Sequence, residues 1–129
     1  MIPDQIFLTR LAAIVGHNHM LQGDQLYGIA SSFWDPKQLQ ARALVRPGST
    51  REVGAIMALC CELEQPVVVR GGLTGPVGGA VAASELLAIS LERMTAMEPV
   101  NSVNSCLVVE AGSTLQAAQE HAARSGQNW

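Results

Sequence analysis

The stretch PVVVRGGLTGPVGGA, residues 66–80, joins a β-branched apolar run to a loop with five glycines within the nine residues 71–79. Three consecutive valines favour a strand, and an unbroken apolar run favours one covered on both faces. Glycine has no Cβ, so it permits positive φ and lets the main chain approach a ligand closely. Successive N–H groups in such a loop form an anion-binding concavity. The stretch therefore predicts a strand followed by a loop suited to phosphate.

Two side chains add to this interpretation. Arg70 brings a positive charge to the end of the strand, and Thr74 adds a hydroxyl donor, a combination that suits a diphosphate. A plain glycine-rich turn stays open as an alternative. The loop is not followed by GKS or GKT, which excludes a Walker loop. Its glycines fit a dinucleotide fingerprint only loosely, because Pro76 and the following residues do not open a helix.

The residues before the loop predict a strand–helix–strand unit. Residues 41–47, ARALVRP, read as a short strand, and residues 49–65 read as a helix in which Ser49 and Glu52 form a capping box. Five apolar positions of that helix fall on one face: Val53, Ile56, Met57, Cys60 and Leu63. Two strands joined through a helix imply a right-handed crossover onto a parallel pair.

The flanking segments add helices at both ends. Helical spacing of Phe7, Leu11, Ile14 and Val15 predicts a first helix that ends at Gly16. Residues 17–40 read as irregular connecting structure.

After the loop, residues 86–94 read as a third strand. Two further strands follow around a turn at 101–105, the second spanning 106–111, and their antiparallel pairing makes the sheet mixed. A last helix is predicted to begin at Ser113, with Gln116 completing a capping box, and to end near Gly126.

Composition limits the classes of function. The chain has 129 residues and a net charge of −3 without a basic stripe, so we expect no nucleic-acid partner. Three cysteines without metal-type spacing indicate reduced thiols and a cytoplasmic location. No apolar run approaches the length of a membrane span, and the N-terminus does not read as a signal peptide.

Other single residues carry weaker hypotheses. His17 and His19 lack a carboxylate or cysteine nearby, so we expect no metal site. Cys60 is expected in the helix core, with Cys61 on another face. Four more side chains have simple expected roles: a surface or interface position for His121, a structural ion pair for Arg93, and for Trp34 and Trp129 either a partner contact or no special role.

Three motifs, in order and spacing, resemble a known family. They are VRPGSTREV, RGGLTGPVGG, and LERM leading to VVEAG. They are similar to the first half of a PCMH-type FAD-binding domain of the vanillyl-alcohol-oxidase-like flavoproteins, over about residues 40–126. The branch most similar comprises flavin-dependent D-2-hydroxyacid dehydrogenases, which include glycolate oxidase subunits, D-lactate dehydrogenases and D-2-hydroxyglutarate dehydrogenases.

The resemblance implies a function. FAD would be bound non-covalently, since relatives that attach it covalently often have histidine where this chain has Thr74. A D-2-hydroxyacid would be oxidised to a 2-oxoacid, with electrons passing to a separate acceptor. Leu73 departs from the glycine or asparagine usual in relatives and is expected to crowd the diphosphate or resist positive φ. The implied cofactor contacts are Arg70, Gly71, Gly72, Leu73, Thr74, Gly75, Val77 and Gly78.

The expected architecture is an α+β chain with a mixed sheet. Residues 1–79 would form a parallel βαβ first lobe, and residues 80–129 an incomplete, partly antiparallel second lobe. The family's cap domain and catalytic residues are not recognised after Trp129, so we expect no catalytic residue here and no turnover by this chain alone. Two alternatives stay open: an interaction module that oligomerises through its open sheet edge, or another FAD-linked oxidase of the same fold with a different substrate.

Overall fold

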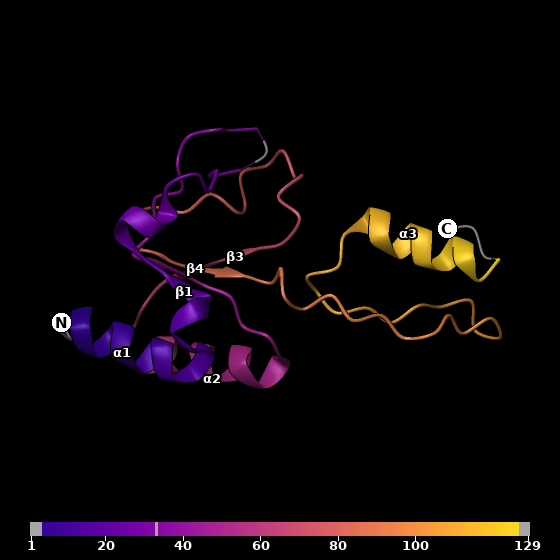
Figure 1. Ribbon diagram of the computed structural model, residues 1–129, viewed down its shortest axis with the longest axis horizontal. Coiled ribbons are helices and arrows are strands. Elements are labelled where there is room, and N and C mark those ends of the chain that lie inside the picture. The colour runs from indigo at the N-terminus through magenta and orange to yellow at the C-terminus, as the bar shows by residue number, and fades with distance from the viewer. Residues whose placement is uncertain (1–3, 33, 127–129) are drawn as a thin grey trace.

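A computed structural model describes residues 4–32 and 34–126 and contains one four-stranded sheet (Figure 1). The strand order is β1 (Met20–Leu21), β2 (Ala43–Val45), β4 (Leu87–Ser90) and β3 (Val67–Arg70). β4 runs parallel to both β2 and β3, whereas β1 pairs antiparallel with β2. The predicted mixed sheet of an α+β chain is confirmed.

The order of the strands corrects two predictions about the crossover. β2 and β3, joined through α2 (Thr50–Glu62), are parallel but not adjacent, because β4 lies between them. The strand covered on both faces is also β4, whose four residues are all buried. β3 lies at the edge of the sheet, where the covering layers end, and its Val69 is 49% exposed.

One face of the sheet packs against two helices, α1 (Asp4–Val15) and α2. Phe7 and Leu11 of α1 and Ile56 of α2 are buried with Val45 and Ile89 of the sheet in one apolar cluster. The helix ends also follow the sequence. Gly16, just after α1, has φ 85°.

The N-terminus of α2 is capped as its sequence indicates. The Ser49 hydroxyl accepts a hydrogen bond from the Glu52 N–H at 3.2 Å. The Glu52 carboxylate accepts one from the Gly48 N–H, one residue before the predicted partner. One predicted core position is wrong, because Met57 is 42% exposed and Leu59 is buried in its place.

Residues 17–40 are more ordered than predicted. They include β1, which belongs to the sheet, and two 3-10 helices, η1 (His17–His19) and η2 (Gly23–Leu26). On the other face of the sheet, apolar side chains of η2 and of the residues that follow it pack in a second cluster, whose buried members are Leu26, Leu39, Leu44, Val68 and Ala88. A strand of two residues has no periodicity that could reveal it.

The C-terminal residues stand apart from the sheet in Figure 1. The two predicted strands here are wrong as continuous strands, since only the isolated antiparallel bridges Met97↔Val109 and Asn101↔Cys106 form. α3 (Leu115–Arg124) lies along this hairpin, and His121 Nε2 lies 3.0 Å from the Glu98 carbonyl oxygen. The cap of α3 is Thr114, not the predicted Ser113, and it accepts from the Ala117 N–H at 3.1 Å.

The expected boundary between lobes precedes β4. Because β4 lies inside the sheet between β2 and β3, residues on both sides of Gly79 share one sheet. The division into lobes at 79/80 and the oligomer through an open edge stay predictions. Arg93 makes the expected ion pair, with its Nη1 3.8 Å from Glu52 Oε2. Among the described helices, none is long and apolar enough to cross a bilayer.

Candidate cofactor site

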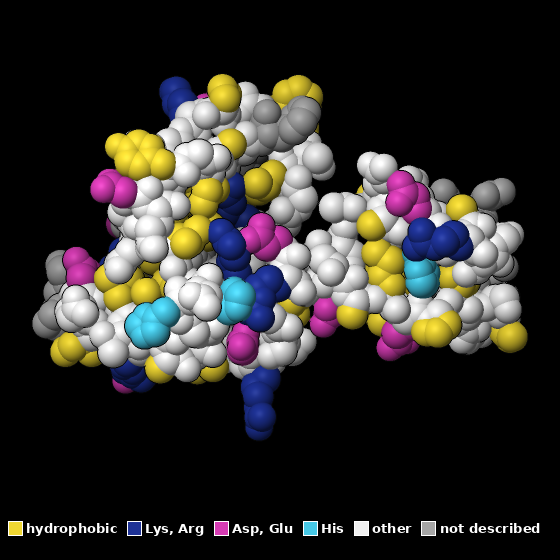
Figure 2. All heavy atoms as spheres, viewed as in Figure 1, with side chains coloured by type: hydrophobic (Ala, Val, Ile, Leu, Met, Phe, Trp, Pro, Cys, Tyr) yellow, Lys and Arg dark blue, Asp and Glu magenta, His cyan; other side chains and the backbone are white. Residues whose placement is uncertain are grey.

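A hollow of about 190 Å³ lies at the carboxyl ends of the parallel strands. Arg46 follows β2, Ser90 ends β4 and Arg70 ends β3, so three neighbouring strands bring polar side chains to one edge. Ligands of open parallel sheets bind outside this edge. Figure 2 shows basic and acidic side chains gathered where this face is hollowed. The full lining is Ile29, Ala30, Leu44, Arg46, Arg70, Gly71, Leu73, Ser90 and Glu92.

Arg70 is the buried cation of this hollow, with 3% of its surface exposed. Its Nη2 donates a hydrogen bond to the Ala30 carbonyl oxygen at 2.6 Å, but its buried Nη1 has no hydrogen-bond partner among the described residues. Burial lowers the pKa of Arg70, and the nearby Glu92 carboxylate opposes that shift. A buried donor without an acceptor is costly, so Nη1 is suited to an anion in the hollow.

A second arginine is already paired there. Arg46 Nε lies 2.7 Å from Glu92 Oε1, close enough for an ion pair but without the alignment of a hydrogen bond. Glu92 thus pairs with Arg46 and acts on Arg70 only through its charge, and both guanidinium groups line the hollow. The excess of positive charge favours a ligand that carries negative charge.

The glycine loop leaves its main-chain donors free. No hydrogen bond among the described residues has the N–H of any residue from 71 to 80 as its donor. Pro76 has no N–H to offer, which leaves nine amides. A Cβ built on Gly71, Gly75 or Gly79 meets no atom within 4 Å, so the space beside these residues is open. Free amides and open space are what a diphosphate requires.

Backbone conformation in the loop differs from the expectation. Of its five glycines only Gly78 has a positive φ, at 78°, whereas Leu73 adopts φ 60°. The left-handed conformation that glycine permits is therefore not used at Gly71, Gly72, Gly75 or Gly79. The strained position is Leu73, whose departure from the family pattern was expected to resist positive φ.

The structure brings only part of the predicted set into the hollow. Arg70, Gly71 and Leu73 line it. The remaining predicted residues lie along the exposed arm of the loop: Gly72, Thr74, Gly75, Val77 and Gly78. Sequence reasoning missed Arg46, Ser90 and Glu92, although their places at or just after the ends of strands were a usable signal.

In the described part of the chain, the other titratable and nucleophilic side chains form no second site. Among the described residues no group of three potential metal ligands exists, His17 and His19 included. Burial raises the pKa of the Cys60 thiol to about 11, while Cys61 is exposed on another face of α2, as predicted. Trp129 lies outside the described residues.

Comparison with known proteins gives one family and several relatives. The family model "FAD binding domain" matches residues 41–128. The chain is 37% identical over 91 residues to a D-lactate dehydrogenase of Archaeoglobus fulgidus. The matched segment covers 70% of this chain and 20% of the dehydrogenase. It is 40% identical over 93 residues to a D-2-hydroxyglutarate dehydrogenase of Xanthomonas citri, and the matched segment covers 72% of this chain and 19% of that protein. The chain thus spans about a fifth of the length of these relatives.

Solved structures share the fold. An alkyldihydroxyacetonephosphate synthase superposes with a TM-score of 0.78 at 16% identity, covering 95% of this chain and 25% of the synthase. 4-Ethylphenol oxidase from Gulosibacter chungangensis gives a TM-score of 0.77 at 20% identity, and the superposed part covers 95% of this chain and 24% of the oxidase.

The site and the comparisons agree. Free loop amides beside an unsatisfied buried guanidinium fit the diphosphate of FAD, and the resemblance to D-2-hydroxyacid dehydrogenases is confirmed by the relatives. Over residues 41–128, this chain belongs to the FAD-binding domain family of FAD-linked oxidoreductases.

Proposed function

We propose that this chain binds FAD non-covalently, with the diphosphate on the glycine loop and on Arg70. The nine free amides of residues 71–80 carry the proposal, because they supply donors without displacing an internal partner. The buried Nη1 of Arg70 supplies a charged donor beside them. Thr74 has no nucleophilic ring nitrogen, which supports attachment without a covalent bond.

The reaction proposed for the whole protein is oxidation of a D-2-hydroxyacid to a 2-oxoacid. Support comes from the named activities of the two relatives, which act on D-lactate and D-2-hydroxyglutarate. When bound, the flavin supplies the acceptor for the hydride of the α-carbon. This chain's residues hold and orient the cofactor, and we propose that turnover needs residues beyond them and a separate electron acceptor. Three unpaired thiols support a reducing compartment such as the cytoplasm.

Arg70→Met tests the cofactor site directly. Loss of a charge-assisted hydrogen bond should weaken FAD binding roughly 10- to 100-fold. The control is Arg51→Met, at an exposed position of α2, which changes net charge equally and should leave the FAD affinity unchanged. Isothermal titration with FAD measures both variants.

Two results would count against the proposal. A wild-type chain that binds no FAD overturns it. An equal loss of FAD affinity in both variants would mean that Arg70 contributes only through the net charge of the protein. Acid precipitation of the loaded protein should release all flavin to the supernatant; flavin that stays with the pellet contradicts non-covalent binding.

A further inference from the structure

Residues 29–39 form a small structure that we name the finger; its residue 33 lies outside the described part. Ala30 and Gln38 pair as an antiparallel bridge, and the Leu39 N–H donates to the Ile29 carbonyl oxygen at 2.7 Å. Near the tip, the Ser31 N–H donates to the Lys37 carbonyl oxygen at 2.8 Å. The finger precedes residue 41, where the family match begins.

The base of the finger forms a wall of the hollow. Ile29 and Ala30 line it, and the Ala30 carbonyl oxygen accepts the hydrogen bond from Arg70 Nη2. Leu39, 1% exposed, anchors the finger in the apolar cluster that also holds Val68 of β3. The Arg70 guanidinium therefore depends on a hydrogen bond to Ala30, a residue outside the segment that the family model matches.

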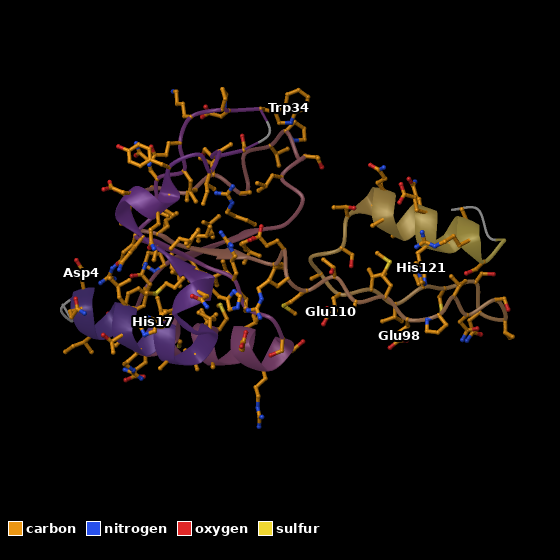
Figure 3. All side chains as sticks on the ribbon, viewed as in Figure 1. Asp4, His17, Trp34, Glu98, Glu110 and His121 are labelled. Atoms are coloured by element: carbon orange, nitrogen blue, oxygen red, sulfur yellow. The ribbon has the colours of Figure 1, made fainter. Side chains whose placement is uncertain are left out.

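The tip of the finger reaches the glycine loop. Trp34 Nε1 donates a hydrogen bond to the Thr74 carbonyl oxygen at 3.3 Å, and Figure 3 shows Trp34 at the end of the finger beside the loop. The ring itself is 64% exposed. Among the described residues, the finger is connected to this region by a hydrogen bond to the last residue of β3 and by another to the middle of the loop.

The bond at Thr74 has a consequence for the next amide. In a trans peptide the carbonyl oxygen and the following N–H point in opposite directions, and no cis peptide occurs in the described chain. Holding the Thr74 carbonyl toward the finger therefore turns the Gly75 N–H away from it. It also occupies an oxygen that would repel a phosphate. In this orientation the Gly75 N–H has no acceptor among the described residues.

We propose that the finger is part of the FAD site and that Trp34 is a positioning residue for the Gly75 amide. This inference rests on the proposed function of the loop. It extends the site to residues that the family match does not include.

The experiment uses Trp129→Phe as background, which leaves Trp34 as the only tryptophan of the two in the chain. Trp34→Phe keeps an aromatic ring and removes the N–H donor. FAD affinity should fall roughly two- to tenfold, the effect of one hydrogen bond. The ¹⁵N order parameter of Gly75 should also fall, while the urea midpoint stays unchanged because the ring is exposed. The matched control is Tyr27→Phe, an exposed aromatic outside the finger, which should change none of these.

A spectroscopic signature separates positioning from a structural role. Inorganic pyrophosphate does not absorb tryptophan emission, so a shift of Trp34 emission on its addition would show that the finger senses loop occupancy. Full FAD affinity in Trp34→Phe, or pyrophosphate binding without any change in Trp34 emission, overturns the inference.

Failure of the proposed function gives a different pattern. A background protein that binds neither FAD nor pyrophosphate refutes the cofactor site itself, and the finger's role in that site with it. An order parameter of Gly75 that is equal in both proteins refutes the finger's hold on the loop whether or not FAD binds.

Discussion

Leu73 lies beside Arg70 in the hollow with φ 60°, a conformation that costs a residue with a Cβ about 1–2 kcal/mol. Its neighbours Gly71, Gly72 and Gly75 do not have positive φ. The position whose backbone conformation most favours glycine is therefore occupied by a leucine, which has a branched side chain. The local conformational preference of Leu73 therefore does not decide the backbone at this position.

Leu73→Gly should raise FAD affinity at least twofold, because it clears a side chain from the hollow. The free energy of unfolding should change by less than about 1 kcal/mol, since relief of strain is offset by added freedom of the unfolded chain. Titration with FAD and urea unfolding measure the two effects. Leu73→Asn, which tolerates this conformation while keeping a side chain, separates strain from space. Weaker binding by the glycine variant would mean that Leu73 contacts the cofactor.

At the scale of elements, the ends of the helices were more predictable than the strands. The cap of α2 was predicted at Ser49 and is found there, because a capping hydroxyl and its amide lie three residues apart in sequence. The start of α3 was predicted one residue early, since Ser113 and Thr114 carry the same chemistry. Only the path of the chain shows which hydroxyl faces the helix.

Thr114→Ala should lower the free energy of unfolding by about 1 kcal/mol, the usual effect of losing an N-cap. The neighbouring Ser113→Ala is the control, because the Ser113 Oγ is buried without a hydrogen-bond partner among the described residues. Its removal should be neutral or slightly stabilising. Urea denaturation followed by circular dichroism measures both. A larger destabilisation by Ser113→Ala than by Thr114→Ala would show that Ser113, not Thr114, is the N-cap of α3.

At the scale of the whole molecule, Gly112 joins the hairpin and α3 to the sheet. Its N–H donates to the Met94 carbonyl oxygen at 2.8 Å, and a Cβ built there would lie 1.7 Å from the Leu91 carbonyl oxygen. The nearest atoms belong to the main chain of Leu91 and Met94, so a Cβ at position 112 could be accommodated only by moving the backbone. The close passage of two segments, 21 positions apart, therefore depends on the absence of a side chain.

Gly112→Ala should destabilise the protein by about 3 kcal/mol, at the upper end for overpacking. Gly79→Ala is the matched control, because its Cβ meets nothing within 4 Å and its φ is not positive. That variant should stay within about 0.5 kcal/mol of wild type. Urea midpoints of the two proteins make the comparison, and similar midpoints would contradict the tight junction.

Local features follow directly from the order of residues: the helical faces around Phe7 and Ile56, the strand ending at Arg70, the glycine-rich loop and the family to which the chain belongs. These depend on neighbours within a few residues, so spacing reveals them. The tertiary structure alone decided that β4 separates β2 from β3, and that Arg46, Glu92 and the finger meet Arg70. Such contacts join residues dozens of positions apart, and they form because the sheet places the ends of its parallel strands at one edge.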